Sequence, residues 1–555
     1  MKIALIQSNP VTGALKDNMA ALLAASEAAG RMGADLCVAP EMALCGHNAG
    51  DLLLMSGFAA DCRSVLDAAA KRFGAESSLP PLLLGAPVAN PVPQGKALQC
   101  CAVLLDGGKV SVVGRKVLLP TGGVHDDTRY FEPGVGCGVL QLKGWRLCVA
   151  VGEDAWNDKT FWKGRRTFTQ DPVADFIAAG GADGLINLTA LPFEWGVANL
   201  HQRMLGHLAA RYRVPLVAVN QVGGNDSFVY YGGSLGFARD GSLLARAPYF
   251  EEAVLLVDMA ARDSGAIADE PSSEEKLWQA MVLGTRDFVR KCGLDAVVLG
   301  LSGGVDSALV AALAVEAFGP DKVTGLLMPS PYSSKGSVDD ALALAANLGI
   351  ATHSIPITPM LEAYSRSFGQ AFPKGLAGLA EENIQSRIRC GLLMAYSNSF
   401  NAMLLATGNK SEAAVGYSTL YGDSGGGLAP IGDLYKDQVY AMCRLYNEKR
   451  PGAIPDAILN KAPSAELRPG QKDADSLPPY EVLDPLLRDI VDNRESAAGL
   501  LEKGYEPELA AHVLGMTLKA EFKRHQAPPV LHLSANGFGG PSRMPVVAAL
   551  NGMRR

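Results

Sequence analysis

The sequence predicts an α/β protein with two domains: a stacked sandwich of strands and helices, followed by an open, largely parallel sheet. The 555 residues are more than one hydrophobic core usually supports. Short apolar runs alternate with helix-like segments along the chain, and 48% of the residues are apolar while only 19% are charged. Such a composition is typical of compact domains and argues against extended disorder.

The first domain is expected to contain eight short buried strands, separated by helical segments and glycine-rich turns. We expect these strands at residues 3–7, 36–39, 82–84, 103–105, 147–151, 185–187, 216–220 and 254–257. A polar, acidic stretch that includes Asp269, Glu270 and Pro271 follows them and is the best linker candidate. The predicted organisation is a first domain at 1–265, a linker at 266–276 and a second domain at 277–555.

The second domain is expected to open with a helix at 277–291 and to continue with alternating strands and helices. Its expected strands lie at 296–301, 323–328, 352–355 and 403–407. This alternation predicts a parallel sheet, because helices supply the crossover connections that parallel strands need. Ligands of such sheets collect at the carboxyl ends of the strands.

Charge and cysteine content exclude several classes of protein. The formal net charge is −7 and no long Lys/Arg block occurs, so we expect small-molecule partners and no nucleic acid. The ten cysteines are scattered without a CxxC pair, which indicates neither a zinc site nor a disulfide framework and favours the cytoplasm. The first strand begins almost at Met1 and no apolar run reaches membrane-spanning length, so we expect no signal peptide and no membrane partner.

Residues 302–307, which read Ser-Gly-Gly-Val-Asp-Ser, are the most informative motif. A strand, a glycine-rich turn and a helix in succession point several backbone N–H groups at one spot, where the helix dipole favours an anion. The glycines let the backbone approach a phosphate closely, the serines can donate hydrogen bonds, and Asp306 can hold Mg²⁺. No lysine precedes Ser307, so this is a phosphate loop of a different pattern from Walker A.

A second polar cluster, residues 407–412, directly follows an apolar strand. At a strand end beside the phosphate loop, Glu412 can join Asp306 on Mg²⁺ and Thr407 can contact a nucleotide. Taken alone, Glu412 would be interpreted as a solvated surface carboxylate. Its occurrence together with the loop favours the functional interpretation.

The loop resembles that of the ATP pyrophosphatases, and the second half as a whole resembles NAD synthetase, which adenylates the nicotinate carboxylate of deamido-NAD and displaces AMP with ammonia. The matching runs lie at 299–307, 328–334, 381–389, 407–412 and 461–467. The resemblance implies ATP contacts at Gly300, Leu301, Ser302, Gly303, Gly304, Val305, Asp306, Ser307, Thr407, Lys436 and Ser464. It implies deamido-NAD contacts at Asn383, Arg387, Glu412 and Lys523, and Mg²⁺ ligands at Asp306 and Glu412. Without the resemblance, Arg387 and Lys523 would be interpreted as solvated cations on helix faces.

The first half resembles the nitrilase, or carbon–nitrogen hydrolase, fold, an α/β/β/α sandwich. In two-domain NAD synthetases this domain releases ammonia from glutamine with a Glu, Lys and Cys triad. Glu41 matches the general base and Lys116 the lysine that stabilises the oxyanion. The nucleophile should follow the strand at 147–151, where this chain has Gly152. Glycine has no side chain that can attack an amide.

Other positions also depart from the glutaminase pattern. The aromatic-rich Tyr-Gly-Val-Phe-Asp-Glu segment of the family reads Gly-Gly-Val-His-Asp-Asp at residues 122–127, and a lysine expected later in the chain is Ala198. Cys148 lies about 13 Å from Gly152 along one strand at the usual rise per residue. Cys45, near Glu41, is interpreted as a small buried hydrophobe, and His125 as a packing or surface histidine.

We therefore expect an ATP-dependent NAD synthetase that uses Mg²⁺ and free or partner-supplied ammonia, with glutamine as a doubtful donor. The first domain would serve assembly of a homo-oligomer. The nearest alternative is a glutamine-dependent enzyme of the same family that uses Cys45 or an unrecognised nucleophile. A tRNA-thiolating enzyme with a similar loop is disfavoured because the chain has no catalytic cysteine pair and no basic face, and the runs 407–412 and 461–467 argue against a GMP-forming enzyme. The presence of Asp306, Glu412, Lys436 and Arg387 argues against a noncatalytic assembly or regulatory protein built on the same folds.

Overall fold

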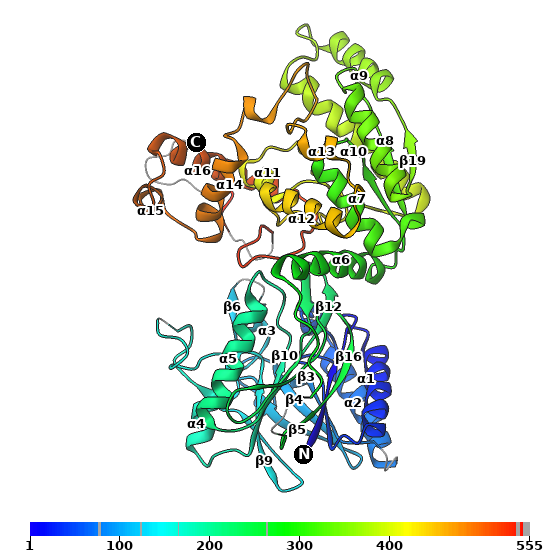
Figure 1. Ribbon diagram of the computed structural model, residues 1–555. Coiled ribbons are helices and arrows are strands. Elements are labelled where there is room, and N and C mark those ends of the chain that lie inside the picture. Colours follow the sequence, from blue (N-terminus) through cyan, green and yellow to red (C-terminus); the bar gives the residue numbers. More distant parts are fainter. Residues whose placement is uncertain (76–78, 123–124, 165, 262–264, 540–543, 548–555) are drawn as a thin grey trace. The chain divides into compact units, whose positions relative to one another are not determined.

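The structure, a computed structural model, describes residues 1–75, 79–122, 125–164, 166–261, 265–539 and 544–547 (Figure 1). The chain forms two compact units, Met1–Lys276 and Leu277–Arg555. Helix α6 (Ser273–Lys291) crosses the division between them. The bounds of the linker at 266–276 stay a prediction.

The first unit is built on two six-stranded sheets that pack face to face. The first sheet has the order β16 (Ala253–Asp258), β1 (Lys2–Gln7), β2 (Leu36–Val38), β3 (Leu82–Ala89), β4 (Leu98–Asp106), β5 (Lys109–Arg115). The second sheet has the order β15 (Leu243–Arg246), β14 (Leu235–Phe237), β11 (Leu216–Asn220), β10 (Gly184–Thr189), β9 (Trp145–Val151), β8 (Gly138–Leu142).

Helices cover the outer face of each sheet, so the unit has four layers (Figure 1). Helices α1 (Leu15–Arg31) and α2 (Phe58–Ala75) pack on the first sheet, and α4 (Pro172–Ala178) and α5 (Val197–Tyr212) pack on the second. The smaller elements are η1 (Gly50–Leu54), β6 (Thr121–Gly122), β7 (His125–Asp126), α3 (Asp127–Tyr130), η2 (Gly152–Ala155), β12 (Val222–Asn225) and β13 (Phe228–Tyr231).

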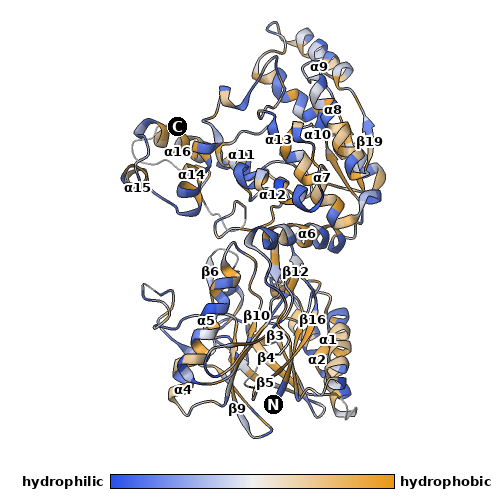
Figure 2. Ribbon diagram, viewed as in Figure 1, coloured by the Kyte–Doolittle hydropathy of each residue, from blue (hydrophilic) through white to orange (hydrophobic). Residues whose placement is uncertain are grey.

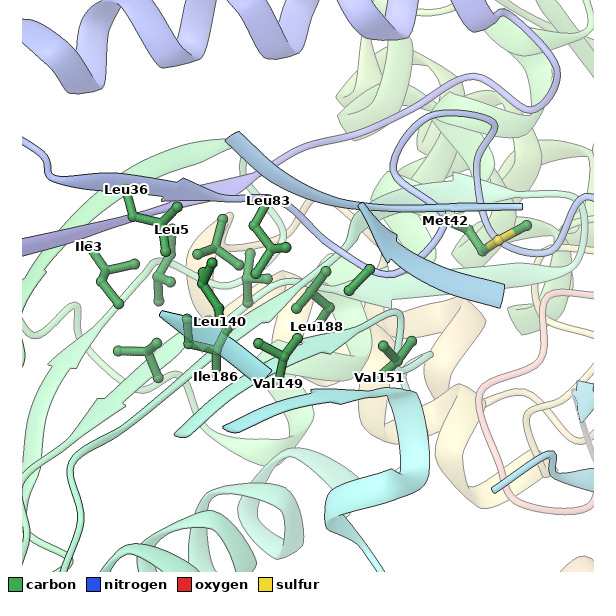
Figure 3. Packing of buried hydrophobic residues seen from close by; sticks show 14 of the residues in the cluster. Ile3, Leu5, Leu36, Met42, Leu83, Leu140, Val149, Val151, Ile186 and Leu188 are labelled. Atoms are coloured by element: carbon green, nitrogen blue, oxygen red, sulfur yellow. The ribbon is translucent and has the colours of Figure 1, made fainter. Parts of the chain in front are cut away.

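Strand periodicity divides the apolar residues of the first unit between its layers. On β1, Ile3 and Leu5 point into the core between the sheets, whereas Ala4 and Ile6 point toward the helices. Figure 3 shows side chains of both sheets meeting in the inner core, with Met42 and Val151 together at one end of it. The residues that precede Met42 and follow Val151 are thereby brought to the same end of the sandwich.

The second unit contains a four-stranded sheet in which every pair is parallel. Its order is β19 (Ala351–Ser354), β18 (Val323–Leu327), β17 (Val297–Gly300), β20 (Met403–Leu404). Helices α9 (Thr358–Ala371) and α10 (Leu379–Phe400) pack against the sheet through a shared apolar cluster. Helix α7 (Val305–Phe318) is buried on almost all sides. Its residues are mostly apolar, which Figure 2 shows as orange.

The remaining elements of the second unit surround this sheet or follow it in the chain. They are η3 (Pro320–Lys322), α8 (Lys335–Leu348), α11 (Lys410–Val415), α12 (Lys436–Lys449), α13 (Asp456–Asn460), η4 (Asp473–Asp475), α14 (Tyr480–Leu487), η5 (Arg488–Asp492), α15 (Ala497–Glu502), α16 (Pro507–Lys519) and α17 (Glu521–Arg524). Within the described residues, no helix has both the length and the apolar character that a bilayer crossing requires.

The predicted α/β fold class is confirmed in both units, and each of the eight strands expected before residue 260 is present. The expectation missed the edge strands β5, β8 and β15, the strand β14 that lies between β15 and β11, and the short strands β6, β7, β12 and β13. β5 and β8 expose several of their side chains, so their sequences lack the continuous apolar run of a central strand.

Candidate functional sites

The predicted phosphate loop joins β17 to α7 at the carboxyl end of the sheet. Gly303 has φ +74°, and a Cβ atom at this position would lie 2.2 Å from the backbone oxygen of Ser337, so only glycine fits. The Ser302 hydroxyl accepts a hydrogen bond from the Gly304 N–H at 3.2 Å, and the Ser307 hydroxyl donates to the Gly304 carbonyl at 3.0 Å. No side chain caps the start of α7, which leaves its first N–H groups available to an anion.

The neighbouring strand end carries the second predicted cluster. β20 pairs in parallel with β17, so the segment after it lies beside the phosphate loop. Asn409 caps α11 by accepting from the Glu412 N–H at 3.0 Å, and its amide donates to Asp306 Oδ1 at 2.9 Å. One side chain thus fixes both the start of α11 and the acidic residue of the loop.

Lys436, at the start of α12, joins the two acidic residues. Its Nζ lies 2.6 Å from Asp306 Oδ2 and 3.4 Å from Glu412 Oε1, and the lysine is buried. Burial favours the neutral amine, but the two carboxylates outweigh it and raise the pKa of Lys436. Burial raises the pKa of Glu412 to about 8, against the attraction of Lys436 and with the repulsion of Asp306.

The two carboxylates are suitable ligands for Mg²⁺. They offer hard oxygen donors on neighbouring segments, and Mg²⁺ in nucleotide sites is usually held by one or two carboxylates together with phosphate oxygens. A nearby cation would also favour the charged form of Glu412. The donor set therefore fits the metal that the sequence predicts.

A cavity of ≈ 840 Å³ in the second unit collects nearly all of the predicted site residues. Its lining includes residues 300–307, Thr407, Lys436, Ser464, Asn383, Glu412 and Lys523. Lys523 donates to the carbonyl oxygens of Gly416 and Ser418 at 2.6 and 2.7 Å, and burial lowers its pKa. The Asn383 side-chain oxygen accepts from the Thr419 hydroxyl at 2.9 Å. This volume is in the range of sites for nucleotide-sized ligands.

Arg387 lies outside this cavity. Its side chain is exposed and donates to the Leu420 carbonyl at 3.1 Å, so its predicted contact with deamido-NAD stays a prediction. Four cations that sequence reasoning did not select line the cavity: Arg389, Lys461, Arg468 and Lys472. Arg389 donates to the Met328 carbonyl, and the Lys461 Nζ lies 3.2 Å from the Gly303 carbonyl. Arg389 and Lys461 lie in the runs 381–389 and 461–467, which carry the family resemblance, so the sequence contained a signal that could have selected them.

The first unit has a buried charge cluster at the end of its inner core. Lys116 Nζ donates to Glu41 Oε1 at 2.7 Å and to Asp127 Oδ2 at 2.5 Å, and all three residues are buried. Burial alone would lower the pKa of Lys116, but the two carboxylates raise it well above its ordinary value. Burial likewise opposes the charged form of Asp127, yet Lys116 holds the pKa of that carboxyl below its ordinary value.

Gly152 lies directly against this cluster. It follows β9 at the start of η2 with φ +56°, in the left-handed region that side chains other than glycine rarely adopt. A Cβ atom here would lie 2.7 Å from both Glu41 Oε2 and Lys116 Nζ. The structure thus brings together the three positions that the resemblance aligns with a glutaminase triad. Of the departing segment 122–127, Gly123 and Val124 lie outside the described residues.

Three cysteines of the first unit could be considered as nucleophiles in place of residue 152. Cys45 is fully buried, and its thiol lies 3.8 Å from the Gly46 carbonyl. Cys148 packs on the helix-covered face of its sheet. Cys100 on β4, which sequence reasoning did not consider, places its Sγ 3.6 Å from Glu41 Oε1. It is 1% exposed, and burial raises the pKa of its thiol well above the ordinary value.

Comparisons with known proteins agree with both units. Residues 2–269 match the carbon–nitrogen hydrolase family and residues 277–527 match the NAD synthase family. This pairing of domains defines a ligase that forms a carbon–nitrogen bond. A glutamine-dependent NAD(+) synthetase of Synechocystis sp. is 43% identical over 99% of each chain, and one of Rhodobacter capsulatus is 39% identical over 98% of each. The chain therefore belongs to the family of two-domain NAD synthetases.

Solved structures show the same architecture over nearly the whole chain. The glutamine-dependent NAD+ synthetase of Acinetobacter baumannii, solved with adenosine diphosphate, has 30% identity and a TM-score of 0.76 over 98% of both chains. One from Cytophaga hutchinsonii shares the fold, with a TM-score of 0.82 at 21% identity. All of these relatives are named for glutamine dependence, so the comparisons give no support to the expectation that glutamine is a doubtful donor.

Proposed function

We propose that the cavity of the second unit binds ATP and deamido-NAD and converts deamido-NAD to NAD. A carboxylate oxygen of the nicotinate attacks the α-phosphorus of ATP and releases diphosphate, and ammonia then attacks the acyl carbon, so that AMP leaves with the bonding electrons. The observation that carries this proposal is the meeting of the loop at 302–307 with the Asp306, Lys436 and Glu412 cluster in one cavity. The ADP held by the Acinetobacter baumannii relative supports the nucleotide class.

Different residues of the cavity are proposed to bind the phosphates, the Mg²⁺ ion and deamido-NAD. The backbone N–H groups of the loop and of the first turn of α7 would bind phosphate oxygens, and Lys436 and Lys461 would offset their charge. Asp306 and Glu412 would hold Mg²⁺, which when bound offsets charge on the phosphate oxygens. Asn383 and Lys523, on the wall of the same cavity, are proposed to contact deamido-NAD.

This chemistry needs no covalent intermediate on the protein in the second unit. Two polyanionic substrates must be held together, and a positioned carboxylate attacks phosphorus more readily than a free one. Cations that are already fixed by ion pairs need little reorganisation when the substrates bind. Positioning and electrostatics are therefore proposed to supply the rate.

For the nitrogen donor, we propose free ammonia or ammonia supplied by a partner. The supporting observation is that the position beside Glu41 and Lys116 is Gly152, which offers no atom that can attack glutamine. The first unit would then keep a structural role, and a homo-oligomer in the cytoplasm stays a prediction that light scattering and localisation can check.

A second candidate is favoured by one specific contact. The Cys100 thiol lies 3.6 Å from Glu41, so a base and a sulfur are adjacent even though residue 152 has no side chain. In this alternative the protein uses glutamine, as its relatives are named to do, with Cys100 as a relocated nucleophile. The deep burial of Cys100 and its raised pKa oppose this reading, because a nucleophile needs access and a thiolate.

One assay separates the two candidates. Full-length protein is supplied with ATP, Mg²⁺ and deamido-NAD, and NAD formation is measured with either ammonium or glutamine, the glutamine first freed of ammonia. We expect turnover with ammonium and only background with glutamine. Robust turnover with glutamine that disappears in C100S but persists with ammonium would establish the second candidate. No turnover with either donor would overturn the proposal for the second unit.

A further inference from the structure

Two histidines and an aspartate meet in the first unit beside the Lys116 cluster. One potential ligand atom from each of His47, His125 and Asp127 lies within 4.8 Å of the others. His47 follows β2 in the chain, His125 lies on β7 and Asp127 begins α3, so the three come from separate elements. The assignment of this cluster does not depend on the nitrogen donor or on the chemistry of the second unit.

We propose that His47, His125 and Asp127 form a binding site for a divalent transition metal of the Zn²⁺ type. Two imidazoles and one carboxylate are ligands that Zn²⁺ uses in protein sites with an open fourth position. The cysteine spacings of the sequence indicate no zinc site, but they do not report on histidines that meet only in the folded chain.

His47 is held in an orientation that suits a metal ligand. Its Nδ1 lies 2.8 Å from the hydroxyl of Tyr230, which is itself buried. A hydrogen bond at Nδ1 leaves Nε2 as the nitrogen for a metal, and such an outer partner is the usual means of fixing a ligating imidazole. The edge-on contact with the Tyr230 ring adds to this positioning.

His125 has a nitrogen with no partner of its own. Its Nδ1 is buried and has no hydrogen bond among the described residues. A buried polar atom without a partner is uncommon in folded proteins and calls for an unseen water or ion. Its other nitrogen, Nε2, lies 3.9 Å from Glu153 Oε1, which places a further oxygen donor at the edge of the cluster.

The charges and spacing of the cluster are compatible with a divalent ion. The carboxylates of Glu41 and Asp127 outnumber the ammonium of Lys116, whose ion pair with Asp127 is made through Oδ2. Zn²⁺ bonds of about 2.0 Å put tetrahedral ligand atoms about 3.3 Å apart, so the side chains need only close up modestly.

The test uses full-length protein purified without a histidine tag. The protein is stripped with a chelator, dialysed against Zn²⁺ and analysed for bound metal by mass spectrometry. We expect one tightly bound Zn²⁺ per chain, and Co²⁺ in its place should give the visible absorption of a site with nitrogen and oxygen ligands. The variants H125Q and H47Q are expected to lose the tightly bound Zn²⁺ ion.

The matched control is H207Q. His207 is a histidine of the same unit that is about one-third exposed and lies near the carboxylate of Asp158, so it reports adventitious binding. The proposal is supported if H207Q still binds one Zn²⁺ ion per chain and H125Q does not. Equal binding in all variants overturns it, and so does the absence of tight binding in the unchanged protein. If a variant fails to fold, anomalous diffraction at the zinc edge from unchanged protein decides: a peak between His47 and His125 supports the site, and its absence excludes it.

Discussion

The Nζ atom of Lys116 lies 2.7 Å from the point that a Cβ atom of residue 152 would occupy. Both clashing neighbours of that point, Lys116 and Glu41, are ends of flexible side chains, so a small side chain can displace them without moving backbone. Gly152 has a left-handed φ of +56°, which costs glycine little but would strain a residue with a side chain. Residue 152 therefore faces Lys116 and Glu41 with backbone alone.

G152C is expected to create a reactive thiol. Lys116 would stabilise the thiolate, so its pKa should fall below the ordinary value of about 8.5. The rate of alkylation at residue 152 by iodoacetamide, measured by peptide mapping against pH, checks this. G152A is the control for the strain of a side chain at φ +56°. A cysteine at 152 that reacts no faster than the exposed Cys292 would contradict the expectation.

G303A is expected to raise the KM for ATP more than about 10-fold, because its Cβ atom would lie 2.2 Å from the Ser337 backbone oxygen and would force the loop to move. G304A is the matched control. Its Cβ atom would meet only the Ser302 hydroxyl at 3.3 Å, and Gly304 has an ordinary extended φ. Steady-state kinetics with ammonium measure both variants, and equal effects would show that the loop geometry is not the cause.

K436M is expected to lower kcat with ammonium about 100-fold or more, because it removes the cation that lies between Asp306 and Glu412. The variant should also be less stable, since two partly buried carboxylates lose their partner. Thermal unfolding separates the two effects. K335A removes an exposed cation outside the cavity and should leave kcat unchanged. If K436M folds normally and keeps full activity, Lys436 has no role in the reaction.

The raised pKa of Glu412 predicts a pH dependence of stability. The folded protein holds this proton up to about pH 8, whereas the ordinary value is 4.5, so the folded state binds the proton more tightly. The stability contributed by the protonated form is therefore fully present below 4.5 and is lost as the pH rises through 8. Thermal unfolding of metal-free protein should show a steeper loss over this window than E412Q does. Parallel profiles would contradict the assignment.

Much of the fold was predictable because its central strands are continuous apolar runs. The strand expected at 216–220 matches β11 residue by residue, and the strand expected at 147–151 lies within β9, which begins two residues earlier. The edge strand β5 was not predicted because most of its side chains are at least partly exposed. Its pattern of apolar and polar residues does not differ clearly from that of a turn-rich segment.

The candidate site of the second unit was predictable to a similar extent. Residues 302–307 and Thr407 meet because parallel neighbours end at the same edge. The choice between Arg387 and Arg389 was beyond the sequence, since both lie on α10 and only the packing of the helix decides which one faces the cavity. The sequence did not identify His47 and Cys100 as candidate site residues, because the residues that they contact, Tyr230 and Glu41, are distant from them in the chain.

The pairing of β17 with β20 has a consequence for how this family can vary. Hydrogen-bonded strands lie about 4.8 Å apart whatever their side chains are. The distance between the phosphate loop and the segment that bears Glu412 is thus set by backbone hydrogen bonds between the two strands. The hydrogen bond from Asn409 to Asp306 also connects the two segments. Insertions in the outer helices can therefore accumulate without changing the distance between the phosphate loop and the Glu412 segment, on which metal and nucleotide binding would depend.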